Sequence, residues 1–376
     1  MTARIRRFLD ESRPPTPCLV IDLDVVRDNY LAFARLLPQA AVYYAVKANP
    51  APEIISLLVR LGSSFDCASI YEVRDCLKAG APARSLSFGN TIKKSADIEA
   101  AHRLGVDLFA FDSAAELHKL AEAAPGARVY CRIVMTGEGA DWPLGRKFGC
   151  EVDMARDLML EAGRLGLEPY GLSFHIGSQQ RDVRQWDVAF GQTAMLFTAL
   201  DEAGVKLGMV NVGGGFPARY RKDGPSPEDH MLALAAAARS HFGNRMPNLI
   251  VEPGRALVGD AGLVQSEIVL ISRKGYRDEE RWVYLDVGKF GGLIETMDEA
   301  IQYRITTERD GAECGPVVLA GPTCDEADVI YQHSNYRLPL ALEVGDKVAI
   351  ESAGAYTASY SSVNFNGLPP LATYCI

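Results

Sequence analysis

The feature that most constrains the fold is a regular alternation of short apolar segments with longer amphipathic ones. Short strands that alternate with helices are typical of a parallel sheet, because each helix returns the chain to the end where the next strand starts. The predicted strands lie near residues 42–46, 64–67, 85–88, 107–111, 128–134, 170–174, 208–212 and 249–252. The predicted helices lie near residues 23–37, 51–61, 69–79, 93–104, 113–124, 152–165, 182–203 and 226–242.

Eight such units over about 230 residues fit a closed (β/α)8 TIM-type barrel, and the alternative is an open, doubly wound sheet. Polar and charged residues at the strand ends favour the barrel. In a barrel the carboxyl ends of the strands form one ring around one pocket, whereas an open sheet spreads them along an edge. The residues at these ends are Lys47, Asp66, Asn90, Asp112, Arg132, His175, the run 213–215 and Glu252.

The pattern changes after Gly259. Predicted strands at 263–272, 282–287, 316–320 and 347–352 are separated by turns, and long helical patterns are absent between them. We therefore expect an α/β fold of two domains. A (β/α)8 barrel would span residues 23–260, and a mostly antiparallel β domain would combine residues 1–22 with residues 261–376.

Charge and composition exclude several classes of function. The net charge of −9 argues against nucleic acid or an anionic membrane as the main partner. The sequence has no apolar run of the length that spans a membrane, and none follows the basic N-terminus, so we expect a cytoplasmic protein without a signal peptide. The eight cysteines are scattered, without a CxxC pair or a Cys/His cluster, and predict neither a metal site nor a disulfide framework.

Lys47 ends the apolar segment 41–46, and Asn49 and Pro50 break the backbone directly after it. Lysine is rarely buried without a partner. Partial burial favours the neutral amine, which can attack a carbonyl and form a Schiff base. The alternative is a lysine at a strand end whose ammonium group reaches water.

Three glycines, Gly213, Gly214 and Gly215, follow the seventh predicted strand. Glycines let the backbone approach a ligand closely and direct several N–H groups at an anion. Loops after the late strands of a barrel are a common phosphate site. The alternative for this run is a flexible turn.

The eighth predicted strand ends in Glu252, Pro253, Gly254 and Arg255. Beside a phosphate site, Arg255 can hold the phosphate dianion, and Glu252 can face a basic ring nitrogen. The alternative is that the two side chains pair with each other.

His175 and Ser178 follow the sixth predicted strand. An imidazole can stack on a flat aromatic cofactor while the serine hydroxyl binds its phosphate, although a lone histidine is also a common structural residue. A Schiff-base lysine, an acid for a pyridine nitrogen and a phosphate site are together the requirements of pyridoxal 5'-phosphate (PLP). A nicotinamide cofactor would instead require a glycine-rich turn after the first strand, where this chain has none.

Two further segments lie in the predicted β domain. Cys324 stands beside three acidic residues within 325–328, with no histidine or second cysteine nearby to make a metal site. The alternative is an acidic surface loop. Tyr356 follows a Gly-Ala pair, and its phenol is long enough to reach a phosphate.

In this order and spacing, the segments resemble the PLP-dependent decarboxylases of basic amino acids with the alanine-racemase-like barrel, specifically the ornithine/lysine decarboxylases. The resemblance covers nearly all of the chain, and residues 286–300 look like the bacterial branch. The segments that carry it are 44–49, 65–69, 175–179, 213–217, 252–255, 324–325 and 354–356.

The resemblance implies a role for each of these residues toward PLP. Lys47 would form the Schiff base, Glu252 would keep the pyridine nitrogen protonated, and His175 would stack on the ring. The remaining cofactor-binding residues implied are Asp66, Arg132, Ser178, Gly213, Gly214, Gly215, Pro253, Gly254, Arg255 and Tyr356.

The resemblance also implies an obligate homodimer with shared active sites. Cys324 would come from the partner chain and protonate the carbanion, and Asp325 would pair with the distal amine of the substrate. Met297 and Asp298 match the other position that binds this amine. Lys147 and Asp328 match positions that pair across the dimer interface.

Two observations narrow the substrate to a basic amino acid. Relatives that act on diaminopimelate carry Cys-Glu-Ser-Gly-Asp where this chain has Cys-Asp-Glu-Ala-Asp, and Asp298 with Asp325 suits an ammonium group better than a second carboxylate. L-Ornithine, giving putrescine for polyamine biosynthesis, is the first candidate, and L-lysine, giving cadaverine, is the second. Glu326 replaces a glycine common in the family and leaves this choice open, since one methylene is worth only about 1–3 kcal/mol.

Two rival functions share parts of this pattern. A non-catalytic regulator on the decarboxylase scaffold would be expected to lack the lysine, the cysteine or the phosphate-binding groups. An amino-acid racemase would share the lysine and the barrel, but the Cys-Asp loop does not support it.

Overall fold

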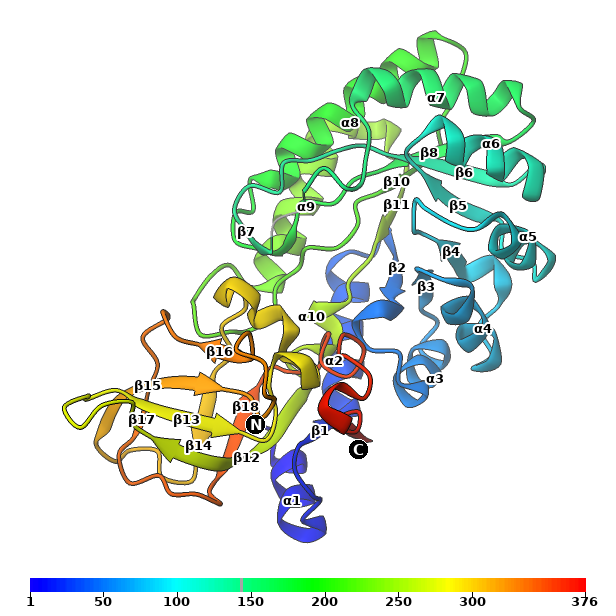
Figure 1. The fold of residues 1–376 in the computed structure, drawn as a ribbon. Coiled ribbons are helices and arrows are strands. Elements are labelled where there is room, and N and C mark those ends of the chain that lie inside the picture. The colour runs from blue at the N-terminus through cyan, green and yellow to red at the C-terminus, as the bar shows by residue number, and fades with distance from the viewer. Residues whose placement is uncertain (143–144) are drawn as a thin grey trace. The chain divides into compact units, whose positions relative to one another are not determined.

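The computed structural model describes residues 1–142 and 145–376, and the described chain divides into two compact units (Figure 1). The barrel unit comprises Arg27–Pro217 and Gly224–Ala256. The β unit comprises Met1–Val26, Ala218–Asp223 and Leu257–Ile376. The segment Ala218–Asp223 has the sequence position of a barrel loop, but its contacts lie in the β unit, where Arg221 N donates to Gln302 O at 2.8 Å.

The barrel unit contains the predicted closed barrel of parallel strands. Its strands are the apolar segments that are too short for stable helices. They pair side by side in the order β10-β11-β2-β3-β4-β5-β6-β8, and the last strand pairs with the first to close the barrel. The predicted fold class is therefore confirmed, and the open sheet is excluded. The strands are β2 (Ala40–Ala45), β3 (Ser64–Cys67), β4 (Leu86–Phe88), β5 (Leu108–Phe111), β6 (Arg128–Arg132), β8 (Glu168–Ser173), β10 (Met209–Asn211) and β11 (Asn248–Val251).

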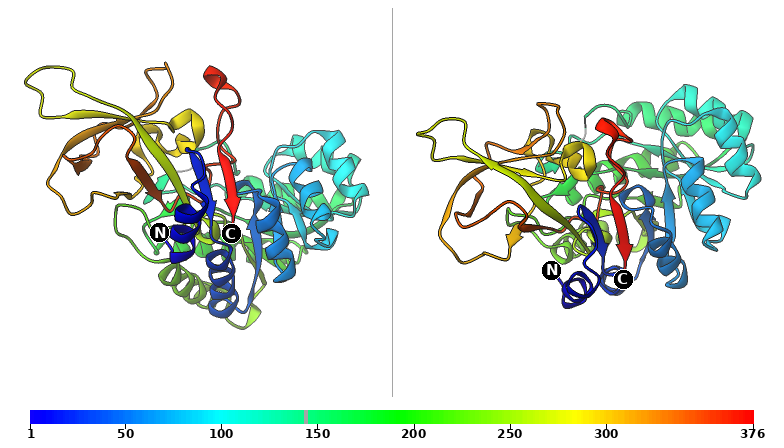
Figure 2. Two further views of the ribbon diagram at one scale, coloured as in Figure 1. Left: turned by 90° about the horizontal axis from the view of Figure 1, so that it is seen from below. Right: turned by 60° about the horizontal axis from the view of Figure 1, so that its bottom comes forward.

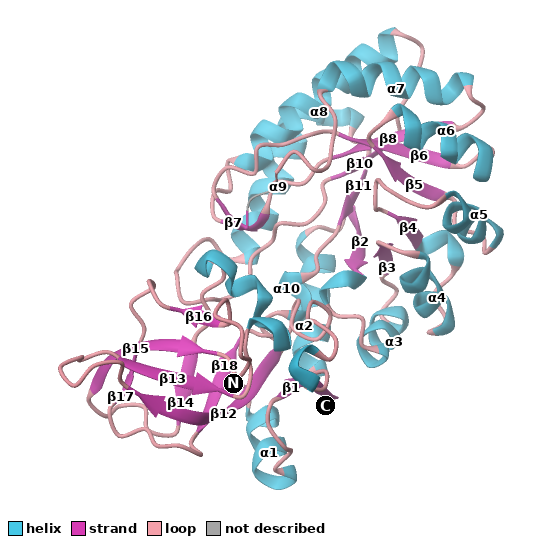
Figure 3. Cartoon of the chain, in the orientation of Figure 1, coloured by secondary structure: helices cyan, strands magenta, loops and turns pink. Residues whose placement is uncertain are grey.

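Amphipathic helices surround these strands (Figure 3). Polar side chains fix where several of them begin. Ser69 and Ser113 accept hydrogen bonds from the backbone of the first turn, and Ser226 forms a capping box with Asp229. The helices are α2 (Leu23–Leu36), α3 (Pro52–Arg60), α4 (Ile70–Lys78), α5 (Ser95–Arg103), α6 (Ala114–Ala123), α7 (Val152–Arg164), α8 (Gln185–Glu202), α9 (Pro227–Phe242) and α10 (Arg255–Val258).

Shorter elements connect the strands and helices. The turns η1 (Val46–Ala48), η2 (Ala83–Ser85) and η3 (Gly243–Arg245) lie in the barrel unit, as does the small sheet of β7 (Ala140–Trp142) and β9 (Ser178–Gln180). Inside the barrel, a cluster of buried side chains fills the space between the strands, as is typical of this fold. It comprises Leu108, Ala110, Tyr130, Met209 and Ile250.

The β unit is built on one mostly antiparallel sheet. The N-terminal strand joins it as expected, because β1 pairs antiparallel with β12 and parallel with β19 at the other end of the chain, as Figure 2 shows. The strands are β1 (Cys18–Ile21), β12 (Gly262–Ser272), β13 (Arg281–Leu285), β14 (Ile305–Thr307), β15 (Cys314–Ala320), β16 (Val329–Tyr331), β17 (Arg337–Pro339), β18 (Lys347–Glu351) and β19 (Ala372–Cys375). The short turns are η4 (Lys289–Leu293), η5 (Ile294–Glu299) and η6 (Phe365–Gly367).

Two helices were not expected from the sequence, the short α10 and one at the N-terminus. The N-terminal segment, interpreted there as a polar start, forms α1 (Ala3–Ser12). Thr2 caps it by accepting from Ile5 N at 3.2 Å, and Ile5 and Leu9, one turn apart, pack against the β sheet. In the described part of the chain, the helices are too short or too polar to cross a membrane.

Candidate active site

Lys47 lies at the carboxyl end of the barrel, in the turn η1 that follows β2. Two hydrogen bonds fix this turn: Tyr44 Oη donates to Asn49 O at 2.9 Å, and Asn49 Oδ1 accepts from Ala51 N at 3.1 Å. The Lys47 Nζ lies 2.8 Å from Asp66 Oδ2. The Asn-Pro break identified in the sequence therefore positions an amine beside a carboxylate of the neighbouring strand.

Asp66 is the buried partner of this lysine. It lies on β3 with 3% of its surface exposed. Its Oδ2 faces Lys47, while its Oδ1 is buried and accepts no hydrogen bond from the described residues. A Cβ atom at Gly89 would lie 1.9 Å from Oδ1, so that position has to be glycine. Asp66 thus holds Lys47 and keeps a second oxygen available to another group.

Glu252 follows β11 and faces the same space. Burial, and then the negative charge of Asp66, raise the pKa of Glu252 to about 7. Lys47, a hydrogen bond from Asn211, and Arg132 act in the opposite direction. Glu252 is therefore an acid that gains or loses its proton near neutral pH, which is the property needed opposite a pyridine nitrogen.

The three glycines after β10 are required by close contacts with neighbouring backbone. A Cβ atom at Gly213 would lie 2.5 Å from Phe174 O, and one at Gly214 would lie 2.9 Å from Glu252 O. One at Gly215 would lie 2.7 Å from a carbonyl oxygen of the loop after β8. Gly213 and Gly215 also have φ angles of 66° and 108°, which favour glycine. The run is therefore a fixed, closely packed backbone and not a flexible turn.

Arg255 and Ser178 meet beside this run. The Arg255 guanidinium, which is 4% exposed, donates from Nη2 to Ser178 Oγ at 3.2 Å. Gln180 N donates to Gly215 O at 3.0 Å, so the strand that carries Ser178 is bound to the glycine backbone. A guanidinium, a hydroxyl and a closely packed glycine backbone therefore lie together, which suits a phosphate group.

The turn at the end of β11 also packs on the lysine turn. Pro253 O accepts from Ala45 N at 3.3 Å, and a Cβ atom at Gly254 would lie 2.9 Å from Ala48 Cβ. Pro253 and Gly254 thus hold the two ends of the site together, with Lys47 on one side and Arg255 on the other.

His175 follows β8 as a neutral ring. Burial, and then the positive charges of Arg132 and Lys47, lower the pKa of His175 to about 3. Its Nδ1 accepts from Gly177 N at 3.0 Å, which places the proton of the neutral ring on Nε2. Burial also lowers the pKa of Arg132, at the end of β6. A neutral imidazole of this kind can cover the face of an aromatic ring.

The other predicted residues lie in the β unit, apart from Lys147. Met297, Asp298, Cys324 and Asp325 are exposed, and Tyr356 is partly buried. Cys324 N donates to Asn366 Oδ1 at 3.0 Å, and Asp325 Oδ1 accepts from Ala327 N at 2.8 Å. The Cys324 backbone and the Asp325 carboxylate are therefore held by hydrogen bonds within the β unit, and both residues are exposed.

Asp328 has a local role in the β unit. It is 3% exposed, and its carboxylate accepts from Lys289 N at 2.7 Å and from both Thr323 N and Thr323 Oγ1. Lys147 is exposed on the barrel unit, with Nζ 5.0 Å from the centre of the Phe148 ring. Asp328 thus shapes the loop that carries Cys324, and its pairing with Lys147 across a dimer interface stays a prediction.

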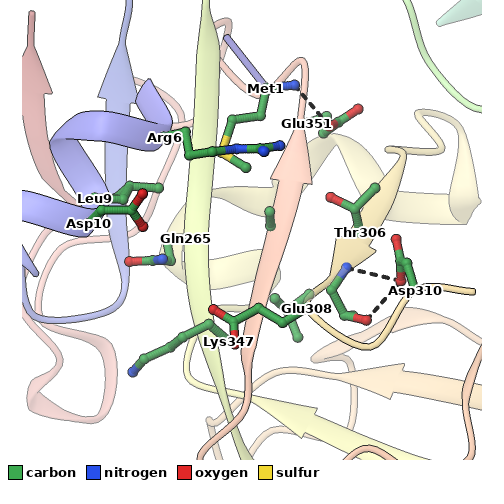
Figure 4. A pocket seen from close by; sticks show the side chains of 13 residues that line it. Met1, Arg6, Leu9, Asp10, Gln265, Thr306, Glu308, Asp310, Lys347 and Glu351 are labelled. Carbon is green, nitrogen blue, oxygen red and sulfur yellow. Dashed lines mark hydrogen bonds and ion pairs between the residues drawn. The ribbon is translucent and has the colours of Figure 1, made fainter. Parts of the chain in front are cut away.

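A separate cavity of about 570 Å³ lies in the β unit, beside α1, β12, β14 and β18 (Figure 4). Its lining is charged, but several of the charges are already paired. The Met1 amine lies 2.9 Å from Glu351, and Lys347 pairs with Glu267. The residues predicted from the sequence do not line this cavity, and we do not assign the chemistry to it.

The residues of the barrel unit fit PLP. PLP has an aldehyde, a pyridine nitrogen and a phosphate, and the barrel unit offers a group for each. Lys47 provides the amine, Glu252 the acid of raised pKa, and Arg255 with Ser178 the phosphate site beside the glycine run. The buried Oδ1 of Asp66, without a partner among the described residues, is a further place for a polar group to bind.

Sequence reasoning missed two buried residues of this site. Asn211, at the end of β10, donates to Glu252, and Gln180 donates to Ile176 O at 2.6 Å beneath the loop that carries His175. The available signal for Asn211 was a polar residue at the end of an apolar strand, two positions before the glycine run.

Comparisons with known proteins agree with this geometry. The family described as "Pyridoxal-dependent decarboxylase, pyridoxal binding domain" matches residues 23–259. The lysine/ornithine decarboxylase of Selenomonas ruminantium is 36% identical over 357 residues, which cover 94% of this chain and 88% of that protein.

Solved structures give the same result. A structure of SrLDC in complex with PLP and cadaverine has a TM-score of 0.89 and 32% identity, covering 100% of this chain and 94% of the other. The lysine/ornithine decarboxylase of Vibrio vulnificus, complexed with cadaverine, has a TM-score of 0.88 and 30% identity, covering 100% of this chain and 99% of the other.

Proposed function

The chain belongs to the pyridoxal-dependent decarboxylases, and on that premise we propose that it converts L-ornithine to putrescine and CO2. It is a PLP-dependent carboxy-lyase for basic amino acids. L-Lysine, giving cadaverine, is the second candidate substrate, because the relatives from Selenomonas ruminantium and Vibrio vulnificus are named lysine/ornithine decarboxylases.

The barrel unit supplies the residues that bind the cofactor. When bound, PLP supplies an aldehyde for the substrate amine and an electron sink for the electrons left when CO2 departs. Lys47 carries the covalent link, and Asp66, 2.8 Å away, orients its amine. Glu252 would hold a proton at the pyridine nitrogen, and the neutral His175 ring would cover the pyridine.

The phosphate would be held by Arg255, Ser178 and the glycine run. Arg255 and Ser178, already 3.2 Å apart, provide a charged and a neutral donor. The N–H groups of Gly213–Gly215 would add backbone donors, and the phosphate role of Tyr356 stays a prediction from the sequence. Together these groups orient the cofactor and exclude water from its phosphate.

The observation that supports the substrate class is that the β unit carries two exposed carboxylates, Asp298 and Asp325, and an exposed thiol, Cys324. Asp298 and Asp325 are suited to the distal ammonium of ornithine or lysine, and Cys324 to protonating the α-carbon. Because these residues are exposed in the single chain, we propose that they complete the site of a second copy in a homodimer. The role in polyamine biosynthesis and the cytoplasmic location belong to this proposal.

The test is a comparison of kcat/KM on ornithine, lysine, arginine and diaminopimelate with PLP-loaded protein. Ornithine is expected to be best and lysine next, with diaminopimelate lower by about a hundredfold because its second carboxylate would face Asp298 and Asp325. A preference for lysine would make the second candidate the first. Turnover of none of the four, with PLP bound, would instead support a non-catalytic regulator.

A further inference from the structure

Asn211 is a buried amide between the two functional parts of the barrel site. It ends β10, is 1% exposed, and lies in register with Ser173 of β8 and Ile250 of β11. A buried amide has to satisfy both its oxygen and its NH2 group, so its partners indicate its purpose.

The two hydrogen bonds of Asn211 connect different groups. Its Oδ1 accepts from Gly213 N at 2.9 Å, and its Nδ2 donates to Glu252 Oε1. The orientation of the amide follows from the partners, because a backbone N–H can only donate and requires the oxygen. The NH2 group is therefore directed at the carboxyl group of Glu252.

A backbone hydrogen bond also connects Gly213 with Glu252. Glu252 N donates to Gly213 O at 2.8 Å, so Gly213 and Glu252 are joined both directly and through the Asn211 side chain. A displacement of the glycine run would thus be transmitted to the residue that faces the pyridine nitrogen.

The amide also acts against the charges around Glu252. Asp66 and burial favour the protonated, neutral form of Glu252, whereas a donor favours the carboxylate. A neutral donor stabilises the carboxylate without adding a charge to the barrel interior. An aspartate at position 211 would keep an acceptor for Gly213 but would replace the donor with a second acid.

We propose that Asn211 is a positioning residue that holds Glu252 as a carboxylate aimed at the pyridine nitrogen and couples it to the phosphate-binding glycines. This inference rests on the proposed roles of Glu252 and of the glycine run. It assigns to Asn211 a task in cofactor binding that is distinct from direct contact with the cofactor.

The test compares N211D and N211A with N248D. Asn248 is exposed at the start of the neighbouring strand β11, and its Nδ2 lies 3.4 Å from Tyr170 Oη. N248D therefore makes the same chemical change at the opposite end of the barrel. One measurement is the pH at which Glu252 loses its proton in the apoprotein, followed by difference infrared spectroscopy with E252Q as the reference. The other is the PLP dissociation constant of the apoprotein at pH 8.

In N211D the midpoint of Glu252 is expected to rise by about one pH unit, and PLP to bind about tenfold more weakly. N248D should match the wild type in both measurements. If N211D also matches the wild type, or if only N211A weakens PLP binding, Asn211 serves the glycine run alone and the inference is overturned. A wild-type protein that binds no PLP would refute the proposed function, while the Glu252 titration would still test Asn211.

Discussion

The barrel unit and the β unit place their acidic residues in opposite environments. In the barrel unit, Asp66 is buried against Lys47, and Glu252 has its pKa raised to about 7. In the β unit, Asp298 and Asp325 are exposed, and the Asp325 carboxylate accepts a hydrogen bond from Ala327 N of its own loop. Cofactor chemistry requires buried groups with shifted pKa values, whereas a site completed by a second chain requires exposed groups. This difference supports the proposal that the barrel unit of one chain binds the cofactor while turnover requires the β unit of a second copy.

The largest expected effect is on Lys47. In K47A the covalent link to PLP cannot form, so activity should fall to background and the visible absorbance of the bound cofactor should disappear. The matched control is K94A, which removes an exposed lysine of the same unit and should change neither. An unchanged visible band in K47A would show that Lys47 does not form the covalent link to PLP. It would also contradict the assignment of cofactor binding to the barrel unit.

The next prediction concerns Cys324, in the β unit. C324A should bind PLP like the wild type but lose about a hundredfold or more in diamine formation, because the proton donor is missing while the barrel site is intact. C314A, at a partly exposed cysteine of the same unit, is the control. Full diamine yield from C324A would refute the proton-donor assignment.

A mixture of K47A and C324A tests whether the two residues serve one site from two chains. Random exchange of subunits leaves half of the dimers with one intact site, so about a quarter of wild-type activity should return. Activity that stays at background, with exchange verified by mass spectrometry, would place both residues in the same chain's site.

Glu252 should make the stability of the protein depend on pH, whereas the exposed acids of the β unit should not. Its folded-state pKa, about 7, lies above its ordinary value of 4.5. Between these values the folded chain keeps a proton that the unfolded chain releases, so this group lowers stability as pH rises from 4.5 to 7, and the loss persists above 7. The E252Q apoprotein should therefore be about 1–3 kcal/mol more stable than the wild type at pH 8 and similar to it at low pH.

Urea unfolding of the apoprotein at acidic and alkaline pH measures this difference. The control is D325N in the β unit, an exposed position where the free energy of unfolding should change by less than about 0.5 kcal/mol at either pH. Equal stability of E252Q and wild type at pH 8 would show that folding does not raise the pKa of Glu252.

The smallest expected effects concern Asp328 and Lys147. D328N places an NH2 group against donors of Thr323 and Lys289, and should lower stability by about 1–3 kcal/mol. K147E should weaken the dimer by about 1 kcal/mol, because Lys147 is exposed and an exposed lysine contributes little to an ion pair. Sedimentation that finds no weakening in K147E would count against the predicted pairing.

The sequence predicted the barrel, and it also predicted that the candidate cofactor residues of the barrel unit stand at strand ends, because both depend on local pattern. Lys47 and Glu252 stand at strand ends, and barrel closure alone brings strand ends together. Asn211 was missed because its partners, Gly213 and Glu252, are identified only by side-chain direction inside the closed barrel. The local role of Asp328 was missed for a similar reason, since Lys289 N is brought to it by tertiary folding.

The most direct test is to map the lysine that carries the cofactor. Protein loaded with PLP and reduced with borohydride is digested, and the modified peptide is identified by mass spectrometry. The modification is expected on Lys47, and reduction should be accompanied by loss of the absorbance near 420 nm. Modification of another lysine, such as the buried Lys93, or a protein that stays colourless with PLP, would contradict the assignment of the chemistry to Lys47.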